Sequence, residues 1–239
     1  MKKCEQLYEG KAKRVFATED RDYVIVSYKD DATAFDGLKK GTIAGKGVVN
    51  NRMSNHLMQY LAGNGIPTHF VKELSDRETL VRRVEIVPLE VIVRNIAAGS
   101  FSKRYGVEEG VVFDRPTIEF SYKNDDLHDP LLNSYHALAL KLATEEEIKS
   151  IIDMAFRINS LLKEYFLSLK VKLVDFKLEF GRTSDGSVIL ADEISPDTCR
   201  FWDAETDEKL DKDRFRRDLG GVENAYHEMM TRVFGENHG

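Results

Sequence analysis

Three ionisable side chains alternate with apolar ones at residues 173–181, and they are the clearest candidates for chemistry in this chain. The segment reads L-V-D-F-K-L-E-F-G. Side chains at alternate positions of a strand point to opposite faces, so Asp175, Lys177 and Glu179 share one face while the apolar residues bury the other. The pattern therefore predicts a strand that presents two acids and a lysine on one face.

A second strand is predicted at 188–193, after a turn signal centred on Asp185 and Gly186. If this turn is tight, Glu179 lies directly opposite Asp192, with the two side chains about 5 Å apart. Facing carboxylates repel each other unless a cation lies between them. Two solvated acids are the commoner arrangement in hairpins, but the lysine and the third acid on this face favour a Mg²⁺ site.

Residues 8–16 contain a glycine and two lysines within a predicted hairpin. Gly10 permits close backbone approach, and Lys11 and Lys13 point to the same side if the chain is extended. Glycine-rich loops of this kind cover the phosphates of ATP in kinases, although no Walker pattern is present here. An exposed basic hairpin edge explains this segment alone at least as well.

Two arginines are candidates for binding anions. A buried strand predicted at 86–94 ends in Arg94, and Ser100 follows at the start of a short helix. A guanidinium fork and free helix N–H groups suit an anionic group, although Arg94 could equally bind loop carbonyls. Arg200 offers a second fork near the acids, while Lys123, in a polar loop, carries no signal by itself.

The composition excludes several classes of protein. The chain has 239 residues, 42% of them hydrophobic, which is enough for one large domain or two lobes. A net charge of −6 and a pI near 5.6 give no support for a nucleic-acid or membrane-surface partner. No apolar run approaches the ~18 residues of a membrane span, and the start does not resemble a secretory signal. The two cysteines lie far apart and favour a reducing cytoplasm, and no histidine pair has metal-ligand spacing, so we set zinc aside.

The hydrophobic pattern predicts a two-lobed α+β protein, with a small β-rich lobe at 1–85 and a larger lobe at 86–239. In the small lobe we expect strands at 7–16 and 23–28 and a helix at 48–61, followed by strands at 79–87 and 90–94 that cross toward the larger lobe.

Two long helices are predicted in the larger lobe. Thr144 and Glu147 form a capping box, and an apolar stripe follows at helical spacing from Ile148 to Leu169. A last helix is expected at 211–234, and the basic residues at its start could be no more than a solvated face.

Taken together, these segments resemble the phosphoribosylaminoimidazole-succinocarboxamide synthase (SAICAR synthetase) family of purine biosynthesis. Residues 86–100, with P-L-E-V-I-V-R and A-A-G-S, and residues 173–181 carry the resemblance most closely. The G-K-A-K hairpin, the D-E-x-S-P-D-x-x-R run, the D-K-D-R-F-R segment and A-F-D-G at 34–37 also fall where the family has such stretches. The resemblance covers essentially the whole chain. It implies an ATP-binding fold with a small antiparallel N-terminal lobe and a larger α/β lobe.

The resemblance also implies one reaction. ATP would activate the carboxylate of 4-carboxy-5-aminoimidazole ribonucleotide, and the amine of L-aspartate would attack it to form the succinocarboxamide, ADP and phosphate. The substrates would be these small molecules with Mg²⁺. A homodimer is what the family suggests.

The resemblance assigns roles residue by residue. The nucleotide-binding set would be Gly10, Lys11, Ala12, Lys13, Val15, Val24, Arg82, Val84, Ile86 and Lys123. The substrate-binding set would be Asp36, Glu90, Arg94, Ser100, Asp197, Arg200, Lys212 and Arg216. Glu179 and Asp192 would hold Mg²⁺, Lys177 would stabilise the transferring phosphoryl group, and Asp175 would orient substrate or accept the amine proton.

Some alternatives stay open from the sequence. Either the Asp36 loop or the segment 212–216 could form the aspartate pocket. A small-molecule kinase would use the same loop and acids but would turn over without aspartate. A nucleotide-binding regulator would bind adenine nucleotide without turnover, but it does not need three ionisable groups on one strand face.

Overall fold

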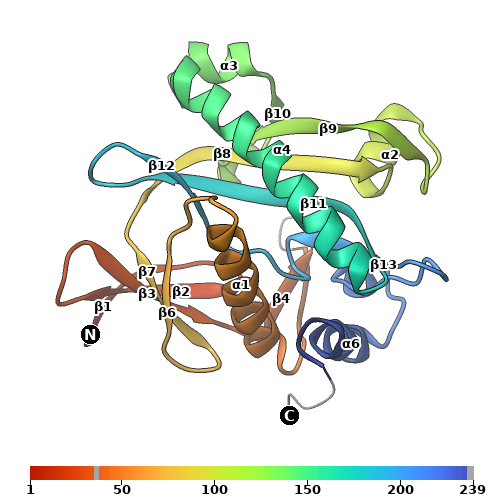
Figure 1. Ribbon diagram of the computed structural model, residues 1–239, viewed down its shortest axis with the longest axis horizontal. Helices are drawn as coiled ribbons and strands as arrows, with labels where there is room; N and C mark the ends of the chain where they lie inside the picture. Colours follow the sequence, from red (N-terminus) through yellow and green to blue (C-terminus); the bar gives the residue numbers. More distant parts are fainter. Residues whose placement is uncertain (35–37, 236–239) are drawn as a thin grey trace.

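A small antiparallel sheet forms much of the N-terminal third of the chain (Figure 1). The computed structural model describes residues 1–34 and 38–235. The five strands of this sheet, in spatial order, are β1 (Lys3–Glu9), β2 (Lys13–Thr18), β3 (Tyr23–Tyr28), β7 (Glu78–Arg82) and β6 (Phe70–Glu73). We call it the small sheet.

A second, larger antiparallel sheet contains the strand predicted at 173–181. In spatial order its members are β10 (Leu131–Leu132), β9 (Val112–Tyr122), β8 (Glu85–Ile96), β11 (Val171–Arg182) and β12 (Val188–Ala191), and β13 (Cys199–Asp203) also pairs with β11. We call it the large sheet. A separate two-stranded ribbon is formed by β4 (Asp31–Ala34) and β5 (Lys39–Thr42).

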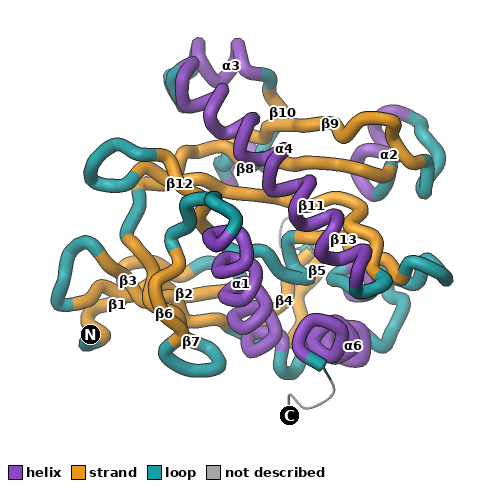
Figure 2. The backbone as a smooth tube through the Cα atoms, viewed as in Figure 1, coloured by secondary structure: helices purple, strands orange, loops and turns teal. Residues whose placement is uncertain are grey.

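The helices cover the sheets and close their ends (Figure 2). They are α1 (Lys46–Gly63), α2 (Gly99–Tyr105), α3 (Ser134–Ala139), α4 (Glu145–Ser168), α5 (Asp213–Arg216) and α6 (Val222–Phe234), with a short 3₁₀ turn at Asp125–Leu127. Figure 1 shows α4 lying across the large sheet. The mixed α+β architecture with antiparallel sheets is therefore confirmed.

The main core lies between α4, α1 and the large sheet. Phe176, Leu178 and Phe180 from β11 are buried there with Ile151 and Leu57 from the two helices. Because α1 belongs to the first third of the chain but shares this core, it connects the small sheet to the large one. The division at residue 85 stays a prediction, and β8 begins at that position.

The capping box of α4 is confirmed. The Thr144 side chain accepts a hydrogen bond from the Glu147 backbone N–H, and the Glu147 side chain accepts one from the Thr144 backbone N–H. Glu147 also pairs with Arg182 at the end of β11, so the same acid ties the helix start to the large sheet. The helix begins where its first free N–H groups find these acceptors.

The tight hairpin turn predicted after β11 is wrong. Residues 183–187 form a longer loop, closed by a hydrogen bond from the Thr183 N–H to the Ser187 carbonyl, 2.9 Å. This shifts the register by one position, and Glu179 lies opposite Ala191 rather than Asp192.

Other predicted boundaries are wrong as well. The strands expected at 79–87 and 90–94 are divided differently, because β7 ends at Arg82 and β8 runs without interruption from Glu85 to Ile96. The strand expected at 7–16 is two strands, β1 and β2, joined by the turn at 10–12. The helix expected at 211–234 is interrupted between α5 and α6 by Gly220 and Gly221, whose φ angles of 70° and 60° lie in the left-handed region. Leu219, between the two helices, is exposed.

Candidate active site

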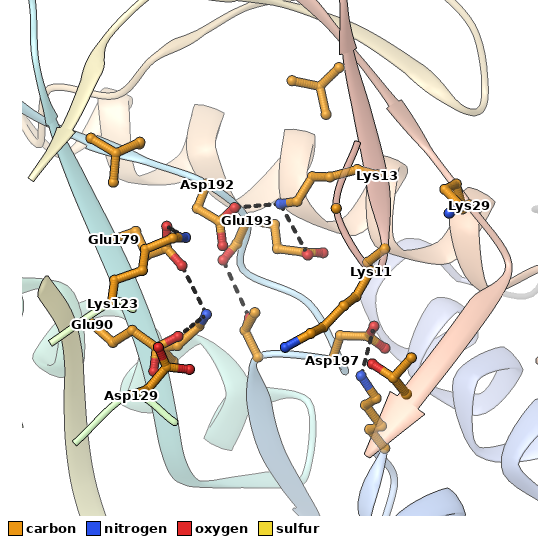
Figure 3. Close-up of a pocket in the computed structure, with 18 of the residues that line it drawn as sticks. Lys11, Lys13, Lys29, Glu90, Lys123, Asp129, Glu179, Asp192, Glu193 and Asp197 are labelled. Atoms are coloured by element: carbon orange, nitrogen blue, oxygen red, sulfur yellow. Dashed lines mark hydrogen bonds and ion pairs between the residues drawn. The ribbon is translucent and has the colours of Figure 1, made fainter. Parts of the chain in front are cut away.

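One cavity of about 1540 Å³ gathers the predicted site residues from both sheets (Figure 3). It is bordered by the turn between β1 and β2, by β3, β8 and β11, and by the segment between β12 and α5. Every predicted site residue that the structure describes lines it: Gly10, Lys11, Ala12, Lys13, Val15, Val24, Arg82, Val84, Ile86, Glu90, Arg94, Ser100, Lys123, Asp175, Lys177, Glu179, Asp192, Asp197, Arg200, Lys212 and Arg216. Asp36 lies outside the described residues.

The basic turn between β1 and β2 faces the large sheet. The Gly10 N–H donates to the Lys13 carbonyl over 2.8 Å, which closes the turn. The Lys11 ammonium lies 2.9 Å from Asp125, and the Lys13 ammonium lies 3.2 Å from Glu193 and also pairs with Asp192. Figure 3 shows Lys13 pointing toward these two acids. The hairpin is therefore not a solvated basic edge, because Lys13 is held inside the cavity.

An apolar wall lies next to this turn. Val24, Val26, Tyr28 and Val81 are buried in one cluster of the small sheet, and Val15 packs against it. All three valines of the cluster also line the cavity, and so does Val15. The cavity thus offers an apolar surface beside a strongly charged one, as a site for a nucleotide base and its phosphates requires.

The central lysine lies between two acids on the large sheet. The Lys177 ammonium is 2.7 Å from Glu90 and 2.9 Å from Glu179, and Lys123 donates to the other Glu179 oxygen. Burial alone would lower the pKa of Lys177, but Glu179, Asp192 and Glu90 raise it above its ordinary value. Lys177 is therefore a permanent cation at neutral pH and cannot act as a general base there.

Asp192 reaches the cavity although it is not the cross-strand partner of Glu179. In a regular strand it would point to the face opposite that of Ala191. Asp192 instead has φ 58°, in the left-handed region, so the alternation is broken just after β12 ends. Burial alone would raise its pKa, but Lys13, Lys177 and Lys123 hold the pKa well below its ordinary value. The carboxylate is therefore ionised at neutral pH.

Glu179 and Asp192 are the candidates in this cavity for holding a magnesium ion together with phosphate. In the part of the chain that the structure describes, no group of three or more His, Cys, Asp and Glu side chains is arranged to hold a metal by itself. Mg²⁺ commonly takes only one or two carboxylates and completes its octahedron with substrate phosphates and water. Glu179 and Asp192 supply that number of ligands.

Arginines and acids alternate at the other end of the cavity. Asp175, on the same face of β11, accepts from both Arg94 and Arg200, with the Arg200 bonds at 2.9 Å. Arg94 also binds Glu119 over 2.9 Å and the Ser100 hydroxyl over 3.2 Å. Within the described part of the chain, the Arg94 guanidinium donates four hydrogen bonds, all of them to side chains and none to a loop carbonyl.

A third charged group surrounds Asp197. One of its oxygens accepts from Lys46 over 2.8 Å and lies 3.4 Å from Lys212, while the other accepts from the Tyr226 hydroxyl over 2.6 Å. Burial would raise the pKa of Asp197, but Lys212 and Lys46 hold it well below the ordinary value. This carboxylate is thus held by side chains of α1 and α6 and by Lys212, the residue just before α5.

Sequence reasoning missed several of these residues. Glu193 and His69 line the cavity, and fully buried Lys46 supports it from behind. Glu193 follows Asp192 directly, so the acidic pair could have been noticed. The sequence carries no signal for Lys46 or His69, because lysine is rarely buried and a single histidine has many roles.

Comparisons with known proteins agree with this geometry. A family model described as SAICAR synthetase matches residues 6–233. A phosphoribosylaminoimidazole-succinocarboxamide synthase of Coprothermobacter proteolyticus is 63% identical over 233 residues, which cover 98% of this chain and 99% of that protein.

Solved structures show the same fold. The synthase of Ehrlichia chaffeensis has a TM-score of 0.95 at 46% identity, covering 98% of this chain and all of that one. A SAICAR synthetase solved in complex with ADP has a TM-score of 0.95 at 47% identity over the same shares.

Fold, cavity and relatives define a carbon–nitrogen ligase of purine biosynthesis. The chain belongs to the SAICAR synthetase family. No helix of the described residues is long and apolar enough to cross a membrane.

Proposed function

We propose that this enzyme joins L-aspartate to the carboxylate of 4-carboxy-5-aminoimidazole ribonucleotide, with ATP as the energy source, through an acyl phosphate. The observation that carries the proposal is a single cavity with three parts: an apolar wall with lysines, a pair of acids bound to lysines, and a group of arginines. A reaction of three anionic substrates needs these parts within reach of one another.

The acyl phosphate solves a chemical difficulty. A carboxylate is a poor electrophile, because its charge repels the amine and its oxygen is a poor leaving group. Transfer of the γ-phosphoryl group from ATP to a carboxylate oxygen releases ADP and creates a good leaving group. The aspartate nitrogen then attacks the acyl carbon, the C–O bond breaks, phosphate leaves and the amine loses a proton.

The nucleotide fits the part of the cavity next to the small sheet. Val15 and Val24 would pack on the adenine ring, and Arg82, Val84 and Ile86 would offer backbone hydrogen bonds. Lys11, Lys13 and Lys123 would bind the phosphates, and Gly10 and Ala12 would let the turn approach them. The relative solved with ADP supports an adenine nucleotide as the ligand.

Mg²⁺ would be held by Glu179 and Asp192. When bound, it would neutralise charge on the phosphate oxygens. Lys13, Lys177 and Lys123 hold the pKa of Asp192 well below its ordinary value, so this carboxylate is charged and ready to bind a cation. Glu179, its neighbour in the cavity, pairs with Lys123 and Lys177.

Lys177 would stabilise the phosphoryl group during its transfer. Its fixed position between Glu90 and Glu179 supports an electrostatic role rather than proton transfer. Asp175 would orient the substrate. Because Arg94 and Arg200 already occupy both its oxygens, a role as proton acceptor is the weaker of the two proposals.

The ribonucleotide and aspartate would occupy the arginine end. Arg94, Ser100 and Arg200 would bind the ribonucleotide's phosphate or carboxylate, and Glu90, Asp197, Lys212 and Arg216 would complete the substrate sites. The loop around Asp36 and the segment 212–216 remain the two candidates for the aspartate pocket.

The test is ADP release with Mg²⁺-ATP and the ribonucleotide, with and without L-aspartate. We expect release that depends on aspartate, together with a succinocarboxamide detected by mass spectrometry. Turnover without aspartate would instead identify a small-molecule kinase, and nucleotide binding without turnover would identify a regulator.

We also propose that the enzyme is a cytoplasmic homodimer, on the basis of its family and of its two widely separated cysteines. Cys4 is exposed and Cys199 is buried, and both are free. Analytical ultracentrifugation of the purified protein should give the mass of two chains.

A further inference from the structure

Carboxylates join the arginines of the cavity into one continuous chain of ion pairs. Asp175 bridges Arg94 and Arg200, and Asp213 then bridges Arg200 and Arg216. The three arginines and Asp175 line the cavity. Asp213 is 3% exposed and lies behind them.

Two carboxylates and one glycine fix the position of Arg200. Its Nε donates to Asp213 over 2.8 Å, and its Nη1 lies 2.9 Å from both oxygens of Asp175. Nη2 lies against Gly99, where an added Cβ would be only 2.3 Å away. Nη2 donates to no other described residue, and Arg200 lines the cavity.

Asp213 divides its two oxygens between two arginines. Oδ2 accepts from Arg200 and Oδ1 accepts from Arg216 over 2.7 Å. One carboxylate thus sets the positions of two guanidinium groups from different elements, β13 and α5.

Asp213 is itself held in place. Its N–H donates to Asp211 over 2.7 Å, and the other Asp211 oxygen accepts from the Phe201 N–H over 2.8 Å. Asp211 therefore ties the start of α5 to β13. This contact fixes the distance between the two arginines through the backbone as well as through the side chains.

We propose that Asp213 is a positioning residue of the ribonucleotide site, which holds Arg200 and Arg216 so that together they bind an anionic group of that substrate. The inference rests on the proposed function and adds a residue that does not touch the substrate. Two like-charged guanidinium groups repel each other and have several rotatable bonds. A carboxylate between them offsets the repulsion and removes the entropy cost of ordering them at each binding event.

The first test replaces Asp213 by Asn. The change keeps the size of the side chain and removes the charge that attracts both arginines. We expect the KM for the ribonucleotide to rise about tenfold or more, because the loss of one charge-assisted hydrogen bond weakens binding by about that factor. The KM for ATP should change by less than about threefold, because the nucleotide lies at the other end of the cavity.

Asp203→Asn is the matched control. Asp203 forms the same kind of pair with Arg232, 2.7 Å, and it does not line the cavity. This variant should be destabilised but should keep the KM for the ribonucleotide. If the two variants change that KM equally, Asp213 is only structural and the inference is wrong.

The second test displaces the Arg200 guanidinium without removing a charged group. Gly99→Ala places a Cβ against the guanidinium, whereas Gly106→Ala, at the other end of α2, places one in open space. Both glycines have positive φ, 55° and 65°, so the two variants share a similar backbone cost. Only Gly99→Ala should weaken ribonucleotide binding, and equal effects would contradict the role of Arg200.

Direct binding separates the inference from the proposed function. Ribose 5-phosphate carries the phosphate of the substrate but not its carboxylate, and its affinity for all five proteins can be measured by calorimetry. Weaker binding to Asp213→Asn and Gly99→Ala would identify the phosphate as the bound group. Unchanged binding, with a raised KM for the ribonucleotide, would identify the carboxylate. Unchanged binding and unchanged KM would overturn the inference. A wild-type protein without ligase activity would overturn only the proposed function, since the affinity of the five proteins for the ribonucleotide itself, measured in the same way, would still decide the role of Asp213.

Discussion

Pairs of opposite charge explain how so many ionisable groups can be buried around one cavity. Glu179 is only 2% exposed, and burying a carboxylate without a partner is costly. Lys123 and Lys177 offset this cost by binding its two oxygens. The same lysines can bind phosphate oxygens, so the charges that stabilise the folded site are those that a polyanionic substrate requires.

Replacing Lys177 by Met should lower kcat far more than it raises the KM for ATP. The ammonium would be most useful when charge develops on the transferring phosphoryl group, and loss of one such group typically costs roughly 10²–10³ in rate. Steady-state kinetics with ATP as the varied substrate measure both constants. Lys172→Met is the control. Lys172 lies on the same strand as Lys177, and its pair with Asp207 is outside the cavity. A change in KM alone would contradict the proposed role.

Replacing Asp192 by Asn should raise the Mg²⁺ concentration needed for half-maximal activity, by about tenfold, because a neutral amide is a weaker ligand for a hard cation. Asn tolerates the left-handed backbone at this position, so the change tests charge rather than conformation. A magnesium titration at saturating substrates measures the effect. Asp185→Asn, in the exposed loop of the same hairpin, should leave the titration unchanged.

At the scale of elements, the sequence predicts those strands and helix ends whose signal lies within a few neighbouring residues. The alternation at 173–181 located β11, and Thr144 with Glu147 located the start of α4, because both signals lie within a few residues. The register of β12 depends on a loop closed by hydrogen bonds of Thr183 and Asp185, which no periodicity reports. Buried Lys46 pairs with Asp197 of the segment after β12, and Asp197 also binds Tyr226 of α6, so its surroundings come from distant parts of the chain.

The helix cap offers a test of one such local signal. Thr144→Ala removes the hydroxyl that accepts from Glu147, and it should lower the free energy of unfolding by ~1 kcal/mol. Activity should be unchanged, since α4 lies on the side of the large sheet away from the catalytic residues that line the cavity. Thr144→Ser keeps the hydroxyl and should retain most of the stability in urea unfolding. A loss of activity in the alanine variant at full folding would show that α4 does more than support the sheet.

At the scale of the whole molecule, the cavity joins distant parts of the chain. Lys13 of the small sheet pairs with Asp192 and Glu193 beyond the large sheet, and Tyr226 of the last helix binds Asp197. The contacts of Lys13 cross the predicted boundary between the lobes. The contact of Tyr226 brings the C-terminal helix to the site. Stability and activity should therefore respond together when such a buried group changes its charge.

Two buried groups should give the stability opposite dependences on pH. Burial lowers the pKa of His69 to about 4, from an ordinary value of 6.5, against the attraction of Asp192. Between these pH values the unfolded chain binds a proton that the folded chain does not, so stability is lost as the pH falls through that window. Burial and the neighbouring Asp213 raise the pKa of Asp211 to about 7, from 3.8, against Arg200 and Arg216. Here the folded chain binds the extra proton, and stability is lost as the pH rises toward 7.

The two contributions partly cancel in the wild-type protein between about pH 4 and 6.5, and single variants should separate them. Urea unfolding at several pH values should show stability rising more steeply with pH in Asp211→Asn than in the wild type, because the opposing group is gone. His69→Gln should show the reverse, with stability that falls as the pH rises. The slope is the informative quantity, because each substitution also changes hydrogen bonds and so shifts stability at every pH. If both slopes equal that of the wild type, the two groups do not titrate with the shifted pKa values, and the pH dependence must come from the ion pairs of the cavity.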